Sequence, residues 1–244
     1  MRILFVMAKS KSAKLKRTVK GLLDKIGYRK RKVDFADLNR LEPFCRSYGF
    51  TRGTAIDRYY IERFLEKNAP LIEGRTLEVL NNVYTKRYGG NRVTHSDVLD
   101  INPANPAATI HEDLRTLATV PDAQYDCVVL TQTLHVIDDD ESVLRQVHRI
   151  LKPQGRLLLT VPCISKVGRQ DIDGTWYRFY TDHGIRFVLD RAFQPSDYSV
   201  EYHGNVLTAT AFLYGLAVHE IEPRAFETED PEFPLIIGVV ARKA

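Results

Sequence analysis

The sequence predicts an α/β protein with a mostly parallel sheet, and residues 125–162 carry most of this prediction. Residues 128–130 form an apolar run that is too short for a helix and is typical of a strand covered on both faces. Residues 144–151 place apolar side chains at helical spacing, and a Pro/Gly turn at 153–155 separates them from a second apolar strand over 157–161. A strand–helix–strand unit of this length indicates a parallel crossover.

Glycine, proline and changes of hydrophobic period divide the rest of the chain into further elements. Helices are expected over residues 13–26, 54–71, 182–193 and 207–218. Strands are expected over residues 76–80, 92–97, 108–110, 200–202 and 235–240. In the helix over 54–71, the side chains expected to face the core are Tyr60, Phe64 and Leu65. The acids at 138–140 should begin a helix, where negative charge is favourable.

Composition restricts the class of protein. A chain of 244 residues is long enough to bury one good core with a small addition. No apolar run reaches the roughly 18–20 residues that span a bilayer, and no signal peptide is visible, so a cytoplasmic protein is expected. The cysteines, Cys45, Cys127 and Cys163, are too widely spaced for a disulfide framework or a zinc cluster, and no metal site is expected. The nicotinamide-binding glycine fingerprint is also absent.

The positive charge of the chain is concentrated at its N-terminus. Residues 1–32 contain twelve Lys/Arg and a single acid, Asp24. The simplest interpretation is a solvated helix over 13–26; the alternatives are contact with an anionic membrane surface, an RNA backbone or an acidic partner. We therefore divide the chain into a basic N-terminal arm or lid, residues 1–50, and a main domain, residues 51–244.

The main domain resembles the class I S-adenosylmethionine (SAM)-dependent methyltransferases. The resemblance is carried by Tyr125-Asp126-Cys127-Val128 with His135, by the Leu-Lys-Pro-Gln-Gly-Arg run at 151–156, and by Arg-Gly-Thr-Ala-Ile-Asp-Arg-Tyr-Tyr-Ile at 52–61. It implies a Rossmann-like sheet of seven strands flanked by helices, with the last strand antiparallel. It also implies SAM as cofactor and S-adenosylhomocysteine (SAH) as product. The chain looks most similar to the type 11-like branch, found among bacterial polysaccharide and natural-product enzymes.

The resemblance also implies which residues hold the cofactor. An acid at the end of the second strand binds the ribose in this superfamily, and Asp97, followed by Val98, is aligned with it. Asp113 and Leu114 are aligned with the residues against the adenine, and a helix or turn cap is the structural alternative for both acids. Residues 131–132, which are Thr131 and Gln132, should line the cleft near the methionine portion.

The first strand departs from the pattern of the superfamily. Glu78 is retained, but Leu80 and Asn81 stand where glycines usually bring the backbone close to SAM, and Tyr84 follows in the same loop. Asparagine adopts left-handed backbone conformations more readily than other non-glycine residues, so Asn81 and Asn82 are plausible substitutes. These residues remain the expected cofactor contacts. A methyltransferase fold that serves as a non-catalytic scaffold is the alternative.

His135 follows the fourth predicted strand and is the candidate general base for an acceptor hydroxyl; a histidine that only hydrogen-bonds at the strand end is the alternative. The residues expected around the acceptor are Arg52, Arg58, Tyr60, Trp176, Tyr177, Arg178 and His183. The resulting hypothesis is methyl transfer to a hydroxyl, or an amine, of a small-molecule or saccharide acceptor. RNA methylation through the basic arm is a less favoured alternative.

Overall fold

The computed structural model describes residues 36–168 and 176–244. The predicted basic helix over 13–26 therefore lies outside the described residues. Contacts divide the chain after Leu41, and the described part of the first unit holds one short turn of 3₁₀-helix, Ala36–Leu38. The arm and its boundary at residue 50 stay predictions. Among the described helices, none combines the length and apolar character needed to cross a membrane.

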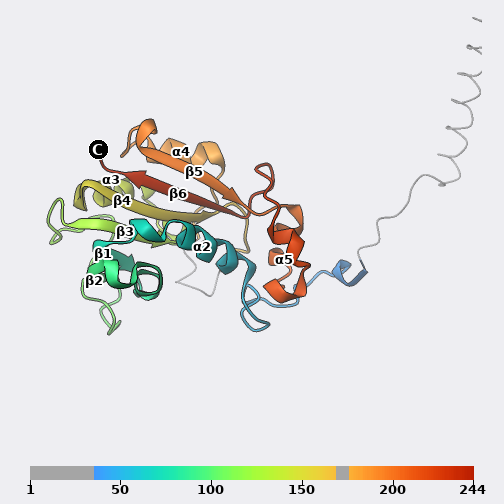
Figure 1. Ribbon diagram of the computed structural model, residues 1–244. Helices are drawn as coiled ribbons and strands as arrows, with labels where there is room; N and C mark the ends of the chain where they lie inside the picture. The colour runs from blue at the N-terminus through green and yellow to red at the C-terminus, as the bar shows by residue number, and fades with distance from the viewer. Residues whose placement is uncertain (1–35, 169–175) are drawn as a thin grey trace, which may run out of the picture. The chain divides into compact units, whose positions relative to one another are not determined.

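A six-stranded sheet forms the centre of the second unit, residues 42–244 (Figure 1). Its strands are β1 (Gly74–Val79), β2 (Val93–Leu99), β3 (Tyr125–Thr131), β4 (Leu151–Pro162), β5 (Tyr198–His203) and β6 (Ile236–Arg242). The spatial order is β2-β1-β3-β4-β6-β5. The first four of these are mutually parallel, and β6 runs antiparallel to both β4 and β5. The predicted Rossmann-like class and the antiparallel last strand are confirmed.

The predicted strand over 108–110, which would have brought the sheet to seven strands, is wrong. In the described residues this segment makes only an isolated parallel bridge between Leu99 and Ile110, beside β2. Pro103 and Pro106 precede it, and proline lacks the backbone donor that a ladder needs. The chain therefore reaches the edge of the sheet through turns and touches it at one point, with the N–H groups of Thr109 and Ile110 both donating to the carbonyl of Val98.

The described residues of this unit form four α-helices: α2 (Ile56–Lys67), α3 (Asp140–Ile150), α4 (Asp182–Leu189) and α5 (Val206–Leu213). Each of the last three begins at a side chain that accepts a backbone N–H: Asp139, Thr181 and Asn205. The acidic run at 138–140 thus begins a helix, as predicted. Helices α2, α4 and α5 end earlier than their apolar patterns suggested: a 3₁₀ turn, Ala69–Leu71, follows α2, and turns follow α4 and α5.

The sheet is covered on both faces, with α2 on one side and α3 and α4 on the other (Figure 1). Tyr60, Phe64 and Leu65 of α2 are buried in one core together with apolar residues of β3 and β4, which confirms the predicted inner face of that helix. Residues of α3 and α4 fill the second core. Both faces of the central strands are therefore dry, and the ends of these strands are where polar groups can meet a ligand.

The start of β4 differs from the predicted turn. Pairing begins at Leu151, opposite Tyr125, before the Pro/Gly sequence, and the register shifts before Arg156 pairs with Cys127. Gln154 takes up the irregularity in a left-handed conformation, with φ 67°. The Pro/Gly signal therefore marks a bulged strand entrance and not a separate turn.

Candidate active site

Two cavities adjoin at the carboxyl ends of the parallel strands. The first, the β1–β3 cleft, has a volume of about 320 Å³ and is lined by Val79, Leu80, Leu99, Asp100, Ile101, Glu112, Asp113, Leu114, Arg115, Gln132, Thr133, Val136, Ile137, Asp138 and Tyr177. The second, the aromatic chamber, has about 150 Å³ and is lined by Tyr48, Phe50, Asp57, Arg58, Gln132, His135, Pro162, Ile164, Ser165, Trp176, Phe212 and Ile236. Gln132 lines both, so the two cavities meet at the end of β3.

The backbone bends sharply where two of the strands enter the cleft. Leu80, directly after β1, has φ 70°, and Gln132, directly after β3, has φ 48°. A left-handed conformation is costly for a residue with a side chain, by about 1–2 kcal/mol. Leu80 is held there because its N–H donates to Leu99 O (2.9 Å) and its carbonyl accepts Asn105 Nδ2 (2.8 Å). Leu80 thus adopts the left-handed backbone conformation that glycine usually provides, although the sequence has no glycine at this position.

The side chain of Glu78 holds the loop that follows β1 through hydrogen bonds. Its buried carboxylate accepts the backbone N–H groups of Tyr84 (3.3 Å) and Thr85 (2.7 Å). Burial raises the pKa of Glu78, and these N–H groups act in the opposite direction. Asn81 Oδ1 accepts the N–H of Val83 at 3.0 Å. The predicted cofactor contacts Glu78, Asn81 and Tyr84 therefore do not line the cleft; they shape the loop beside it.

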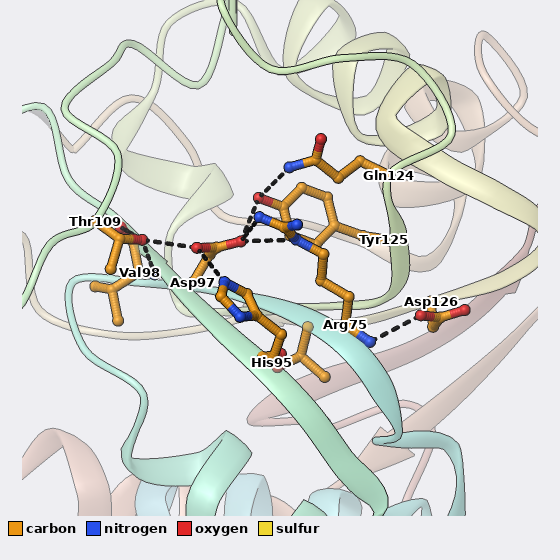
Figure 2. Close-up of polar contacts among 9 residues, drawn as sticks. Arg75, His95, Asp97, Val98, Thr109, Gln124, Tyr125 and Asp126 are labelled. Carbon is orange, nitrogen blue, oxygen red and sulfur yellow. Dashed lines mark hydrogen bonds and ion pairs between the residues drawn. The ribbon is translucent and has the colours of Figure 1, made fainter.

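Asp97 is the centre of a buried polar network (Figure 2). Its Oδ2 accepts Arg75 Nη2 (2.8 Å) and Tyr125 Oη (3.0 Å), and its Oδ1 accepts Thr109 Oγ1 (3.0 Å) and lies 3.2 Å from His95 Nε2. The residue pairs with Leu77 in mid-strand. Neither cavity includes Asp97 or its neighbour Val98. The network joins β1, β2 and β3, and the structure does not bring the predicted ribose acid to the cleft.

Asp100 stands at the position that the prediction assigned to Asp97. Val79 and Leu99 are the last paired residues of β1 and β2, so Asp100 is the first residue beyond the sheet and lines the cleft. Its carboxylate accepts Asn105 Nδ2 (2.7 Å) and the N–H of Asn102 (2.9 Å), which fixes its orientation. Carboxylates at this end of a second parallel strand suit ribose hydroxyls.

The opposite wall of the cleft contains the predicted adenine residues. Asp113 and Leu114 both line it, beside the apolar side chains of Val136 and Ile137. Arg115 pairs with Asp113 and also donates to Asp138 Oδ1 at 2.7 Å, and it spans the rim. The Arg115 guanidinium lowers the pKa of Asp113. The wall therefore offers an apolar slot with a fixed polar edge.

Aromatic rings from three distant segments form the second cavity. Tyr48 stacks between Trp176 and Phe212, with ring centroids 6.2 and 6.1 Å apart. His135 lies 4.3 Å from the Trp176 ring, and the N–H of Tyr177 donates to the His135 carbonyl at 3.0 Å. Trp176 and Tyr177 are consecutive, yet one lines the chamber and the other the cleft, as alternation along an extended segment requires.

Three buried polar atoms in the chamber lack a hydrogen-bond partner among the described residues: His135 Nδ1, Ser165 Oγ and Trp176 Nε1. Leaving such an atom unsatisfied costs about 1–3 kcal/mol, and native proteins rarely tolerate it without reason. Only two other buried side-chain atoms of the described residues share this condition, and neither lines the chamber. The convergence of three on one small cavity points to a polar ligand that completes these bonds.

Burial lowers the pKa of His135 from 6.5 to about 4. The imidazole is therefore neutral at pH 7, and its desolvated Nδ1 is a hydrogen-bonding group more than a proton acceptor. His135 lines the aromatic chamber and not the β1–β3 cleft. Its role as general base stays untested, and the lowered pKa weighs against it.

The titration of His135 can be followed through Trp176, which is the only tryptophan of the chain. A charge on an imidazole 4.3 Å from the indole should change its emission. We expect the Trp176 emission to stay constant near neutral pH and to change only in acid, with a midpoint near the His135 pKa of about 4. His135→Gln should abolish the change. A midpoint near 6.5, the unperturbed value, would contradict the buried neutral state.

The structure distributes the predicted acceptor residues unevenly. Arg58 and Trp176 line the chamber, and Tyr177 lines the cleft. The others lie in neither cavity: Arg52 pairs with Glu220, Tyr60 donates to Thr208 in the core, Arg178 pairs with Asp140, and His183 is exposed on α4. Thr131, at the end of β3, accepts the Thr133 hydroxyl through its carbonyl and also lies outside both cavities.

Several lining residues were missed by the sequence reasoning, notably Asp100, Ser165, Tyr48 and Phe212. For Asp100 a signal existed, because the apolar pair Val98-Leu99 extends the strand beyond Asp97. Tyr48 and Phe212 are far apart in the chain, and no local pattern connects them. Within the described ranges, no group of three or more His, Cys, Asp or Glu side chains is placed to hold a metal ion.

The cleft suits SAM by its own chemistry. Its volume falls in the range of about 300–1,000 Å³ typical of ligand pockets. Asp100 offers a carboxylate to ribose hydroxyls, and Leu114 with its apolar neighbours offers a slot to adenine. Leu80 is the residue that intrudes, and it is 49% exposed and belongs to neither hydrophobic core. The residues present therefore fit the cofactor.

Comparison with known proteins agrees with this geometry. A family model described as "Methyltransferase domain" matches residues 14–212. A SAM-dependent methyltransferase from Archaeoglobus fulgidus superimposes with a TM-score of 0.52 at 16% identity, over 76% of this chain and 94% of that one. The [4+2]-cyclase SpnF superimposes with a TM-score of 0.51 at 16% identity, over 83% and 86%. At such identities the likeness concerns the fold.

Two curated relatives share part of the sequence. "Probable polyketide synthase 5" and "Probable polyketide synthase 7" of Dictyostelium discoideum are each 32% identical over 81 residues, which is 32% of this chain and 3% of either relative. Because the match covers so small a share of those proteins, it gives no information on the activity of this chain. The family match covers most of the chain, and its cleft fits the cofactor. The chain therefore belongs to the methyltransferase-domain family of class I SAM-dependent methyltransferases, and SAM, with SAH as product, is the cofactor that this membership implies.

Proposed function

We propose that the protein transfers the methyl group of SAM to a hydroxyl of a neutral, saccharide-like acceptor. The observation that carries this proposal is the set of three unpartnered buried atoms in the aromatic chamber, His135 Nδ1, Ser165 Oγ and Trp176 Nε1. The chamber adjoins the cleft at Gln132, so a ligand in each would meet at the end of β3.

The chemistry of the unpartnered atoms favours a hydroxylated ligand. Trp176 Nε1 can only donate, so the ligand must offer an acceptor oxygen; His135 Nδ1 and Ser165 Oγ can either donate or accept. A hydroxyl group does both, whereas an ammonium group cannot accept. The stacked rings of Tyr48, Trp176 and Phe212 supply flat apolar surface beside these polar atoms. Rings that carry several hydroxyls present both kinds of surface.

The residues around the two cavities have separable roles in this proposal. Asp100 holds the ribose hydroxyls, and Leu114 with Val136 packs against the adenine. His135 and Trp176 orient the acceptor hydroxyl, which is worth a large part of the rate because positioning alone contributes roughly 7–11 kcal/mol in well-aligned reactions. SAM, when bound, supplies an electrophilic methyl group on a positively charged sulfur.

Two other functions compete with this proposal. RNA methylation was motivated by residues 1–32, which lie outside the described residues. A scaffold without methyl transfer was motivated by the missing glycines, and SpnF, named as a [4+2]-cyclase, illustrates that this fold serves other reactions. Among the described residues, no observation favours either of these functions over methyl transfer to a polar ligand in the chamber.

Binding and transfer can be tested in sequence. Calorimetry with SAH should show binding, and absence of binding at millimolar SAH would favour the scaffold. A panel of neutral methyl glycosides should then change the emission of Trp176, whereas choline should not. The glycoside with the largest effect, incubated with methyl-labelled SAM, should gain label as an acid-stable methyl ether. Label in added RNA, or in no glycoside, would contradict the proposal.

Trp176→Phe gives the sharpest test of the acceptor class. Phenylalanine keeps the aromatic surface but removes the N–H donor, so KM for the glycoside should rise by about 5- to 20-fold, the equivalent of about 1–2 kcal/mol. The affinity for SAH should stay the same because Trp176 does not line the cleft. Phe187→Leu, a change at an exposed aromatic residue outside both cavities, is the control and should leave KM unchanged.

A further inference from the structure

A buried carboxylate faces the aromatic chamber, and the roles described so far leave it unused. Asp57 stands in the first turn of α2, is 8% exposed and lines the chamber. Its Oδ1 accepts the N–H of Arg58 at 2.7 Å, and the N–H of Asp57 itself also contributes. Within the described ranges, no cationic side chain forms an ion pair with it; the Arg58 guanidinium donates instead to Tyr84 Oη at 3.2 Å.

Asp57 is therefore not an exposed charge on the helix surface, the ordinary place for an acid in a first helical turn. A helix-capping carboxylate needs no burial, and most capping acids are solvated. Taking a carboxylate out of water without an ion pair is costly, and such residues concentrate at functional sites. Asp57 shares its cavity with the three unpartnered atoms of His135, Ser165 and Trp176, so the cavity brings together a carboxylate and several groups that orient a hydroxyl.

Two groups in the chamber could receive a proton. Burial lowers the pKa of His135 to about 4, which makes the imidazole a weak base. Burial raises the pKa of Asp57, opposed by the positive charge of Arg58 and by the backbone N–H groups. A general base is most effective when its pKa approaches the working pH. The raised pKa of Asp57 therefore makes it better suited to this role, and the lowered pKa of His135 makes the imidazole less suited.

We propose that Asp57 is the general base that receives the proton of the acceptor hydroxyl, while His135 orients that hydroxyl. This inference rests on the proposed transfer to a hydroxyl. The acceptor oxygen forms a bond to the methyl carbon, the bond between that carbon and sulfur breaks with its electron pair on sulfur, and the hydroxyl proton moves to the Asp57 carboxylate. Release of that proton to water restores the site, so no further reactant is needed.

The ionisable groups that face Asp57 come from three elements: Arg58 on its own helix, His135 after β3 and Tyr48 before α2. Arg58 stays charged, and His135 is neutral above about pH 4, so neither changes its charge near neutrality. Turnover should therefore rise with pH through a single ionisation that lies above 3.8, the ordinary value of an aspartate. Asp57→Asn should remove this rise.

Stability gives a second signature that a capping role would not produce. Because the folded-state pKa of Asp57 is raised, the neutral carboxyl is compatible with folding below the unfolded value of 3.8, and stability is lost as pH rises through the folded value. Above the folded-state pKa the charged, buried carboxylate therefore destabilises the fold. Asp57→Asn should raise Tm by at least about 2 °C on the alkaline side of the pH profile, whereas loss of a helix cap would lower Tm.

The experiment compares wild type, Asp57→Asn and Asp57→Glu, with the methyl glycoside selected by Trp176 emission as acceptor. Glu141→Gln is the matched control, a first-turn carboxylate of α3 that lies in neither cavity. Asp57→Asn should lower kcat by about 10²-fold or more, with the dissociation constant for SAH within threefold of wild type. Asp57→Glu should recover part of this loss, and Glu141→Gln should have wild-type kcat.

The outcomes separate this inference from the proposed function. Wild-type protein that labels no glycoside would contradict the proposed function and the base together. Transfer by wild type that Asp57→Asn retains within tenfold would overturn the base alone. A loss of SAH affinity that matches the loss of turnover would also overturn it, because the carboxylate would then hold the cofactor's ammonium group.

Discussion

Asp100→Asn is expected to weaken SAH binding by at least about tenfold, and by up to about 150-fold. The physical reason is that ribose hydroxyls would lose a charged acceptor, and hydrogen bonds to charged groups contribute about 1.5–3 kcal/mol. Asparagine has the shape of aspartate, and its carbonyl oxygen can still accept the N–H of Asn102, so the loop should keep its course. Calorimetry with SAH measures the affinity, and the thermal midpoint confirms the fold.

The control for this prediction is Asp97→Asn, the same change three residues earlier, inside β2. Asp97 lies outside both cavities, so the folded variant should bind SAH with wild-type affinity. The reverse result, with affinity lost in Asp97→Asn and kept in Asp100→Asn, would restore the sequence-based alignment and contradict the assignment of the ribose to Asp100.

The free energy of unfolding should fall by about 2–3 kcal/mol in Asp97→Asn, the largest stability effect that we expect of a single polar change here. The substitution leaves Arg75 and Tyr125 donating toward a group that has lost its charge and offers one acceptor oxygen in place of two. Urea unfolding monitored by circular dichroism gives the difference. Asp122→Asn, an exposed carboxylate that pairs with Arg149, should change stability by less than about 0.5 kcal/mol.

The contribution of Asp97 should also depend on pH. Burial disfavours its charge, but hydrogen bonds from Arg75, Tyr125 and Thr109 outweigh burial and lower its pKa below 3.8. Because the pKa of Asp97 is lower in the folded state, its charge stabilises the protein fully above the unfolded-state pKa. This stabilisation is lost as pH falls through the folded-state pKa. The difference between wild type and Asp97→Asn should therefore be constant near neutrality and shrink in acid. A difference that grows below pH 4 would contradict the network.

Local patterns were sufficient for much of the fold. The apolar runs of β3 and β4 and the apolar repeat of α3 are determined by which side chains must leave water, and that information lies within a few consecutive residues. The motifs around 125–128 and 151–156 extended this to the family. The expected strand over 108–110 failed because a short apolar segment forms a strand only where neighbouring chain offers continuous pairing.

The sequence by itself thus determined the order of the elements, the faces they bury and the family to which they belong. Only the tertiary structure decided which carboxylate reaches the cleft. Asp97 and Asp100 carry the same functional group and are three residues apart, and the pairing of Val79 with Leu99 places the end of the sheet between them. Tertiary packing likewise buried Asp57 beside Tyr48 and Trp176, which are distant in the chain. A strand ends where its partner ends, and a chamber exists where remote rings meet, so neither is written in the local sequence.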